Sequence, residues 1–204
     1  MAPTTPNAGL AAAALIAAAL AGCGGHASSP VPAPGSIAEA RLQMRPIGAA
    51  RRFHAPAPTR TVSGCRRGLG RRTAAHLELF AEDRVVLVPS GIGTLPPRRR
   101  RNGRIVAARC YGPVVTLEPT GVILVREGTR ATVGDLFRQW GMPLTESVMG
   151  AFRAPRGTRL IAFVGGRRWR RSPAAIPLSR HAAIVIEVGP RVPPHRFYLF
   201  PPGL

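Results

Sequence analysis

Hydrophobic positions in the middle of the chain follow two different periods. A short run of β-branched residues and Leu over 122–125 lies between two glycines, which is the pattern of a buried strand. From Thr132 onward, apolar residues recur every three or four positions up to Trp140, which marks one face of a helix. Thr132 is a suitable N-cap, and Gly141 favours a helix end. We predict a strand over 122–125 and a helix over 132–140.

Further strands are predicted where short apolar runs lie between Gly, Pro or charged turn residues. These runs cover 76–80, 84–88, 114–117, 159–164 and 183–188, with another short strand beginning at Arg167. Glu82-Asp83 is predicted as the tight turn of a first hairpin, and Gly165-Gly166 is a strong type I′ turn signal. Arg98 to Arg101 is a run of four like charges after two prolines, so we predict a solvated loop there.

The order hairpin, helix, strand, short strand, loop, strand resembles the β-grasp fold, in which a helix crosses a mixed sheet. The turn at 164–166, the Ile-Pro-Leu segment at 176–178 and the closing strand at 183–188 have counterparts in its small sulfur-carrier members. The carriers act through a carboxyl-terminal Gly-Gly, for which this sequence has Gly203-Leu204, so only the fold is implied. We expect a β-grasp-like α+β domain with one main helix and an extra N-terminal hairpin. A small β-sandwich with one helix is the alternative.

The amino end carries an apolar run over residues 10–21, which is too short to span a bilayer but has the length of a signal-peptide core. It ends in Leu20-Ala21-Gly22-Cys23, which resembles the lipobox at which bacterial lipoproteins are cleaved and acylated on the new amino-terminal Cys. We therefore expect residues 1–22 to be a lipoprotein signal peptide and Cys23 to be the lipidated residue. The first nine residues contain no Arg or Lys, which disagrees with the usual positive start of such a signal. An ordinary secretory signal or a chance apolar run is the alternative.

Residues 23–72 differ in composition from the rest of the chain. They are rich in Pro, Ala and Arg, and the segment 28–36 is too rich in Pro and Ser to fold. We predict a disordered tether over 23–72 and a single α+β domain over 73–204. Together with the lipobox, this organisation predicts export from the cytoplasm and a lipid-anchored location in the cell envelope.

The sequence contains three cysteines, an odd number for an exported protein. Acylation of Cys23 would leave Cys65 and Cys110 as an even pair in an oxidising compartment, and we predict a disulfide between them. Two free buried thiols are the alternative.

The formal net charge is +20, and all 29 basic residues are Arg because the sequence contains no Lys. Total exclusion of Lys points to a coding bias towards G and C, so the charge alone does not predict a nucleic-acid partner. Such a surface still attracts anions of any kind. The expected partners are the membrane, through the lipid anchor, and either anionic lipid, an anionic envelope polymer or a protein.

One motif is a candidate for anion binding, namely Arg167, Arg168, Trp169, Arg170 and Arg171. An aromatic ring between guanidinium groups can stack on a sugar or base while the charges hold phosphate. An exposed loop in an Arg-rich chain is the alternative interpretation.

The chain also resembles a family of secreted or anchored bacterial proteins of unknown activity. The resemblance rests on the segments 88–93, 121–123, 132–137 and 140–144. In that family a central strand reads Leu-His-Thr-His-Asp, whereas this chain has Val114-Val115-Thr116-Leu117-Glu118. Two His at i and i+2 share one strand face and could ligate a metal. The resemblance therefore implies a metal- or small-ligand-binding module whose His site is lost here.

No catalytic set is apparent in the sequence. None of the five His has a second His, Cys or carboxylate at ligand spacing, and no nucleophile elbow is present. We expect no catalytic residue, metal or cofactor. The leading hypothesis is a non-enzymatic presentation or binding domain on a lipid anchor. The alternatives are the ligand-binding module of the resembled family and an anion-binding module that uses Arg167–Arg171.

Overall fold

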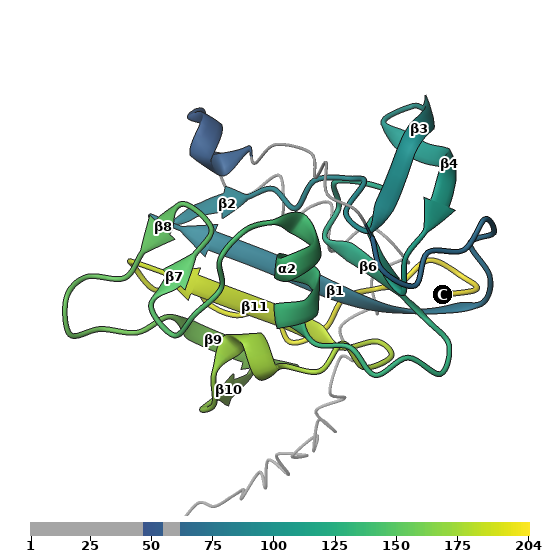
Figure 1. The fold of residues 1–204 in the computed structure, drawn as a ribbon. Coiled ribbons are helices and arrows are strands. Elements are labelled where there is room, and N and C mark those ends of the chain that lie inside the picture. The colour runs from purple at the N-terminus through teal and green to yellow at the C-terminus, as the bar shows by residue number, and fades with distance from the viewer. Residues whose placement is uncertain (1–46, 55–61) are drawn as a thin grey trace, which may run out of the picture. The chain divides into compact units, whose positions relative to one another are not determined.

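The computed structural model describes residues 47–54 and 62–204 (Figure 1). The elements, in chain order, are η1 (Arg51–Phe53), β1 (Arg72–Ala81), β2 (Arg84–Val86), β3 (Thr94–Arg101), β4 (Arg104–Tyr111), β5 (Val114–Val115), β6 (Val122–Arg126), α2 (Val133–Trp140), β7 (Val148–Met149), β8 (Phe152–Arg153), β9 (Ile161–Val164), β10 (Arg167–Trp169), η2 (Pro173–Ala175) and β11 (Ala183–Val188). The predicted signal peptide, the predicted lipidation site Cys23 and most of the predicted tether lie outside the described residues.

The main sheet is mixed and has the strand order β10-β9-β11-β1-β6-β5. β1 pairs in parallel with β11 and antiparallel with β6, and β2 pairs with the far end of β1. A mixed sheet crossed by one main helix confirms the predicted α+β, β-grasp-like fold. The N-terminal hairpin has a larger role than predicted, because its first strand is the centre of the sheet. The reason is the parallel pairing of β1 with β11, which local sequence patterns do not indicate.

The predicted helix is confirmed as α2, and its ends follow from the residues next to it. Thr132 accepts a hydrogen bond from the Asp135 amide through its side chain, and the Asp135 carboxylate accepts one from the Thr132 amide, which makes a capping box. Gly141 ends the helix with φ +80°, in the left-handed region where a side chain is strained. Phe137 and Trp140 are both buried, as the apolar face predicts.

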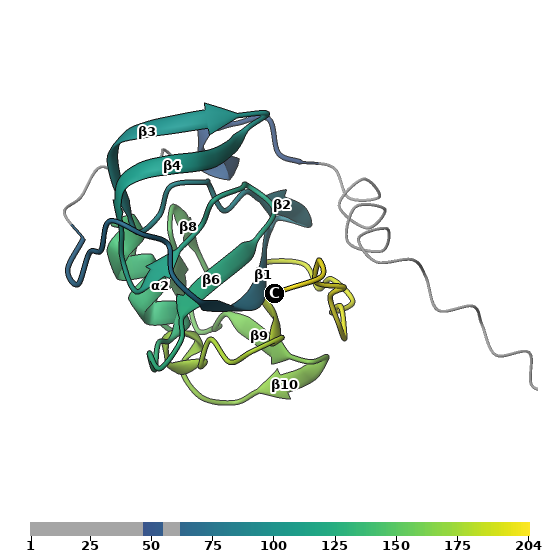
Figure 2. The same ribbon diagram turned by 90° about the vertical axis from the view of Figure 1, so that its right-hand side faces the viewer.

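The sheet is covered differently on its two faces. α2 packs on one face against apolar side chains of β1, β6 and β11, and this is the main core. The other face is covered by the C-terminal tail over 189–204, which lies on the opposite side of β1 from α2 (Figure 2). Val192, Phe200 and Leu204 of this tail pack on two smaller apolar clusters of that face.

The arginine run at 98–101 is not the predicted solvated loop. It forms the second half of β3, which pairs antiparallel with β4 in a hairpin whose two-residue turn is Asn102-Gly103. Both turn residues have positive φ (+49° and +76°), as a type I′ turn requires. The hairpin lies beyond β5, because the Ile105 amide donates to the Leu117 carbonyl at 2.9 Å and Ile105 is buried. One buried side chain and a strong turn signal therefore outweigh the like charges.

Two segments that the sequence assigns to the tether lie against the domain. Phe53 is 3% exposed in the main core, and its ring centroid lies 5.1 Å from that of Phe152. Cys65 forms the predicted disulfide with Cys110 of β4, at a Cα–Cα distance of 5.6 Å. Within residues 47–54 and 62–204, no helix is both long and apolar enough to cross a bilayer.

Candidate functional site

An arginine-lined pocket of about 390 Å³ lies beside β10. Its lining residues are Glu146, Arg159, Leu160, Arg168, Trp169, Arg170, Arg171 and Pro173. We call this the β10 pocket. Four of the five predicted anion-binding residues line it, and Arg167 does not.

Arg159 and Glu146 are the pocket residues that sequence reasoning missed. Both precede β9 in the chain, and the pairing of β9 with β10 brings them next to the arginine motif. Glu146 Oε2 lies 2.9 Å from Arg159 Nη1, so the carboxylate of the pocket already has a cationic partner. Arg168, Arg170 and Arg171 leave the pocket with a clear excess of positive charge.

Trp169 forms one wall of the β10 pocket and does not stand free between the arginines. Its indole is half-buried and packs against the main core, and its Nε1 donates to the Ser172 carbonyl at 3.1 Å. The ring is therefore fixed in place before any ligand arrives. A ring held this way can stack on a flat part of a ligand at little entropic cost. The flexible guanidinium groups can then adjust to the charges of the ligand.

A second polar group lies under the C-terminal tail, where the sequence predicted only isolated histidines. His76 and Glu78 point to the same face of β1 and are 2% and 7% exposed. Glu78 Oε1 lies 3.8 Å from His76 Nδ1, and Glu78 Oε2 contacts Nδ1 of His195 in the tail. The sequence analysis found no carboxylate at ligand spacing from any histidine, whereas the fold brings Glu78 next to both His76 and His195. His76 and Glu78 are two positions apart on a strand, so the sequence could have predicted that they share a face. No local pattern indicated that His195 would lie next to them.

The tautomer of His76 follows from its contacts. Its Nε2 lies 3.0 Å from the Thr120 carbonyl oxygen, which only accepts, so Nε2 carries the proton and donates. Burial lowers the pKa of His76 to about 4, although Glu78 and the Thr120 carbonyl raise it. The ring is therefore neutral at neutral pH. The ring of Tyr198 stacks on it with a centroid distance of 3.7 Å.

This buried group fixes the tail and offers little chemistry. His76 is covered by Tyr198, so a substrate has no direct access to its ring. Within 47–54 and 62–204, no group of three His, Cys, Asp or Glu side chains is placed to hold a metal ion. The arrangement instead ties β1 to the tail by the contact between Glu78 and His195 and by the stack of Tyr198 on His76.

The two positions that carry His in the resembled family are apolar and buried here. Val115 and Leu117 lie in a cluster with Leu124 and Tyr111, on the face of the sheet that the tail covers. Leu117 also lines a pocket of about 300 Å³ whose other walls are mostly apolar residues of β6 and the tail. That region has apolar side chains where the resemblance would place imidazoles.

No protein-family model, curated protein or solved structure matches the chain.

Proposed function

We propose that the chain is a lipid-anchored cell-envelope protein whose folded domain has no enzymatic role and binds an anionic polymer through the β10 pocket. The observation that carries this proposal is the convergence of Arg159 with Arg168, Arg170 and Arg171 on one pocket against a fixed Trp169 wall. Charge alone would be a weak argument in a chain this rich in Arg. A concave site assembled from two separate segments is stronger support.

The pocket favours anions that carry several charges. Guanidinium groups form paired hydrogen bonds with phosphate and carboxylate oxygens, which suits a phosphodiester or uronate polymer. The arginines line a pocket beside β10, which is an edge strand of the sheet, and a repeating polymer can pass along such an edge. Arg159 can exchange its Glu146 partner for a ligand anion, since both side chains are largely exposed.

The polymer-binding part is tested with the full chain and a defined polyanion, such as inorganic polyphosphate. The variant Arg168→Gln/Arg170→Gln/Arg171→Gln should bind at least tenfold more weakly and with a smaller salt dependence, because fewer counterions are displaced. The matched control, Arg99→Gln/Arg101→Gln/Arg109→Gln, removes the same charge from β3 and β4. Equal losses of affinity in both variants would mean that polyphosphate binding reflects net charge. That result would overturn the proposal that the β10 pocket is the binding site.

The anchor is tested separately, by palmitate labelling in cells that export the protein. Labelled protein is expected from the wild-type chain and none from the Cys23→Ala variant. Label that persists in the variant would overturn the assignment of Cys23.

A further inference from the structure

Among the many exposed arginines of the domain, two groups lie at opposite edges of the sheet. β10 is one edge strand, and the β3–β4 hairpin lies beyond β5 at the other edge. In Figures 1 and 2 the hairpin lies on the upper side of the domain and β10 on the lower side. The two surfaces therefore cannot engage the same flat partner at the same time.

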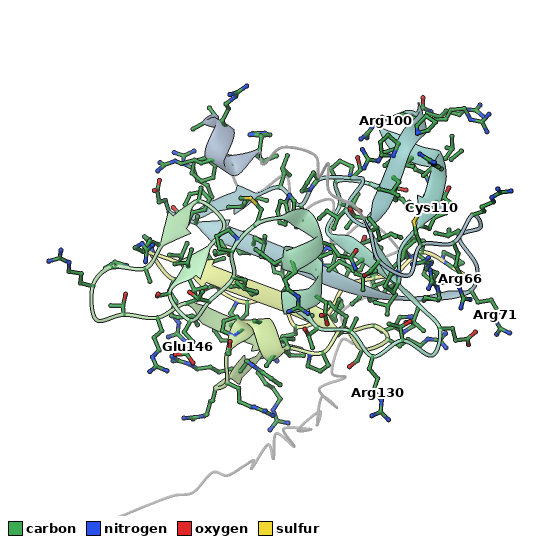
Figure 3. The ribbon with its side chains drawn as sticks, viewed as in Figure 1. Arg66, Arg71, Arg100, Cys110, Arg130 and Glu146 are labelled. Atoms are coloured by element: carbon green, nitrogen blue, oxygen red, sulfur yellow. A yellow bond between two sulfur atoms is a disulfide. The ribbon has the colours of Figure 1, made fainter. Side chains whose placement is uncertain are left out.

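The hairpin turns one side towards the domain and the other towards solvent. Arg98 is half-buried and donates to Thr94, and Arg100, although exposed, reaches back to donate to Ser90 Oγ at 2.6 Å. Arg99 and Arg101 alternate with them and are exposed, as is Arg109 on β4. Figure 3 shows long side chains extending outward around the labelled Arg100 at the end of the hairpin.

An exposed apolar side chain lies among these arginines. Val106 is 42% exposed and occupies an irregularity of the β3–β4 ladder, where Arg99 pairs with Ala107 and Arg100 with Ile105. We call the set Arg99, Arg101, Val106 and Arg109 the hairpin face. Residues 94–111 contain no acidic side chain. A basic surface that also exposes an apolar side chain matches the interfacial zone of an anionic bilayer, where charges meet headgroups and the apolar group enters between them.

The chain enters the domain on the same side. Ile47 forms a parallel bridge with Val85 of β2, and η1 follows it on the upper side of the domain in both views (Figures 1 and 2). Ile47 is 44% exposed, and Arg51 of η1 is exposed beside it. Cys65 also fixes the chain to the base of the hairpin through Cys110. An anchor attached upstream of Ile47 would therefore pull on the side of the domain that carries the hairpin face.

We propose that the hairpin face docks on anionic phospholipid headgroups of the bilayer that holds the anchor, which rests on the proposed lipid anchoring. Docking at this edge turns the β10 pocket away from the membrane, where a polymer can reach it. The domain is then a spacer with a lipid-binding end and a polymer-binding end.

The experiment uses full-length chains with Cys23→Ser, so that acylation does not dominate, and measures sedimentation with vesicles. Vesicles of phosphatidylcholine mixed with phosphatidylglycerol are compared with phosphatidylcholine alone. Neutralising Arg99, Arg101 and Arg109 to Gln should weaken binding to anionic vesicles roughly 100-fold. Neutralising Arg168, Arg170 and Arg171 to Gln removes equal charge and should leave most of the binding intact. Any contribution of the apolar residues 10–21 to vesicle binding is the same in both variants.

A depth measurement separates docking from general attraction. A Trp introduced as Val106→Trp should be quenched by brominated lipid, whereas one introduced as Arg167→Trp at the opposite edge should not. Wild-type protein on vesicles should also recruit polyphosphate. Equal vesicle binding by the two triple variants, or equal quenching at positions 106 and 167, would overturn the docking. Loss of polyphosphate binding in solution, without vesicles, in the Arg99/Arg101/Arg109 variant alone would overturn it as well.

The outcomes for docking and anchoring can be told apart. Suppose that vesicle binding is lost selectively in the Arg99/Arg101/Arg109 variant and that the wild-type chain carries no palmitate on Cys23. This result would support docking and contradict the proposed anchor. Palmitate on Cys23 together with equal vesicle binding by both variants would support the proposed anchor and contradict the docking.

Discussion

The rings of His76 and Tyr198 stack with their centroids 3.7 Å apart and their planes 11° from parallel. This contact joins the central strand of the sheet to the C-terminal tail. His195 and Glu78 form a second link between the same two segments. The tail therefore acts as the second layer of the fold on the face that α2 leaves uncovered.

Tyr198→Ala should lower the free energy of unfolding by about 2 kcal/mol, through lost apolar burial and the lost ring stack. The matched control is Phe197→Ala in the same tail, because Phe197 is 49% exposed and should cost no more than about 0.5 kcal/mol. Urea unfolding of both variants measures the difference. Similar losses at 197 and 198 would contradict the stacking role.

The buried neutral His76 predicts a specific loss of stability in acid. Its pKa is about 4 in the folded protein and 6.5 when unfolded, so between these values the unfolded state binds more protons. Stability is complete above pH 6.5 and falls by about 3 kcal/mol as the pH approaches 4. Unfolding free energies across this range should fall less steeply in His76→Gln, whose amide can still donate to the Thr120 carbonyl.

Glu78 and His195 are charged or titratable groups near the His76 ring, and both are retained in His76→Gln. The difference between the two pH profiles therefore isolates His76. Parallel profiles from pH 7 to 4 would show that His76 is not the group responsible.

Removal of the disulfide by Cys65→Ser/Cys110→Ser should lower the free energy of unfolding by about 3–4 kcal/mol, because a long loop is no longer closed in the unfolded chain. The two cysteines are 45 positions apart, so the closed loop is large. Thiol titration of the unfolded, non-reduced Cys23→Ser chain should find no reactive thiol. Two thiols per chain would contradict the bond.

Gly93 should tolerate substitution much less than Gly128, although both have φ near +75°. A Cβ at Gly93 would lie 1.8 Å from the Val114 carbonyl oxygen, whereas nothing lies within 4 Å of one at Gly128. Gly128→Ala should cost about 1 kcal/mol from backbone strain, and Gly93→Ala several kcal/mol more because backbone must move. Thermal unfolding of the pair measures this contrast.

Local patterns predicted the elements well because each depends on neighbouring residues. The capped helix ending at Gly141, the strand over 183–188 and the turn at Gly165-Gly166 all follow from residues within a few positions. The pairing of β1 with β11 was not predictable in this way, since their partners are about 100 residues apart. The β3–β4 hairpin was missed because four arginines outweighed the Asn102-Gly103 turn signal.

The candidate sites show the same division. The arginine motif at 168–171 was visible in sequence, but its combination with Arg159 depends on how β9 and β10 pair. The approach of His195 to Glu78 depends on the path of the tail, which no period in the sequence encodes. Chemistry that resides in one segment can be predicted, whereas chemistry assembled from several cannot.

The parallel pairing of β1 with β11 also sets when the protein can fold. The central strand lacks one neighbour until residues 183–188 have been synthesised, and its polar face lacks a cover until the tail follows. Contacts this distant in sequence form slowly, because a long loop must close before they contribute. A nascent chain of this protein therefore cannot complete its main sheet before residues 183–188 have been synthesised, or cover the His76 side of β1 before the tail follows.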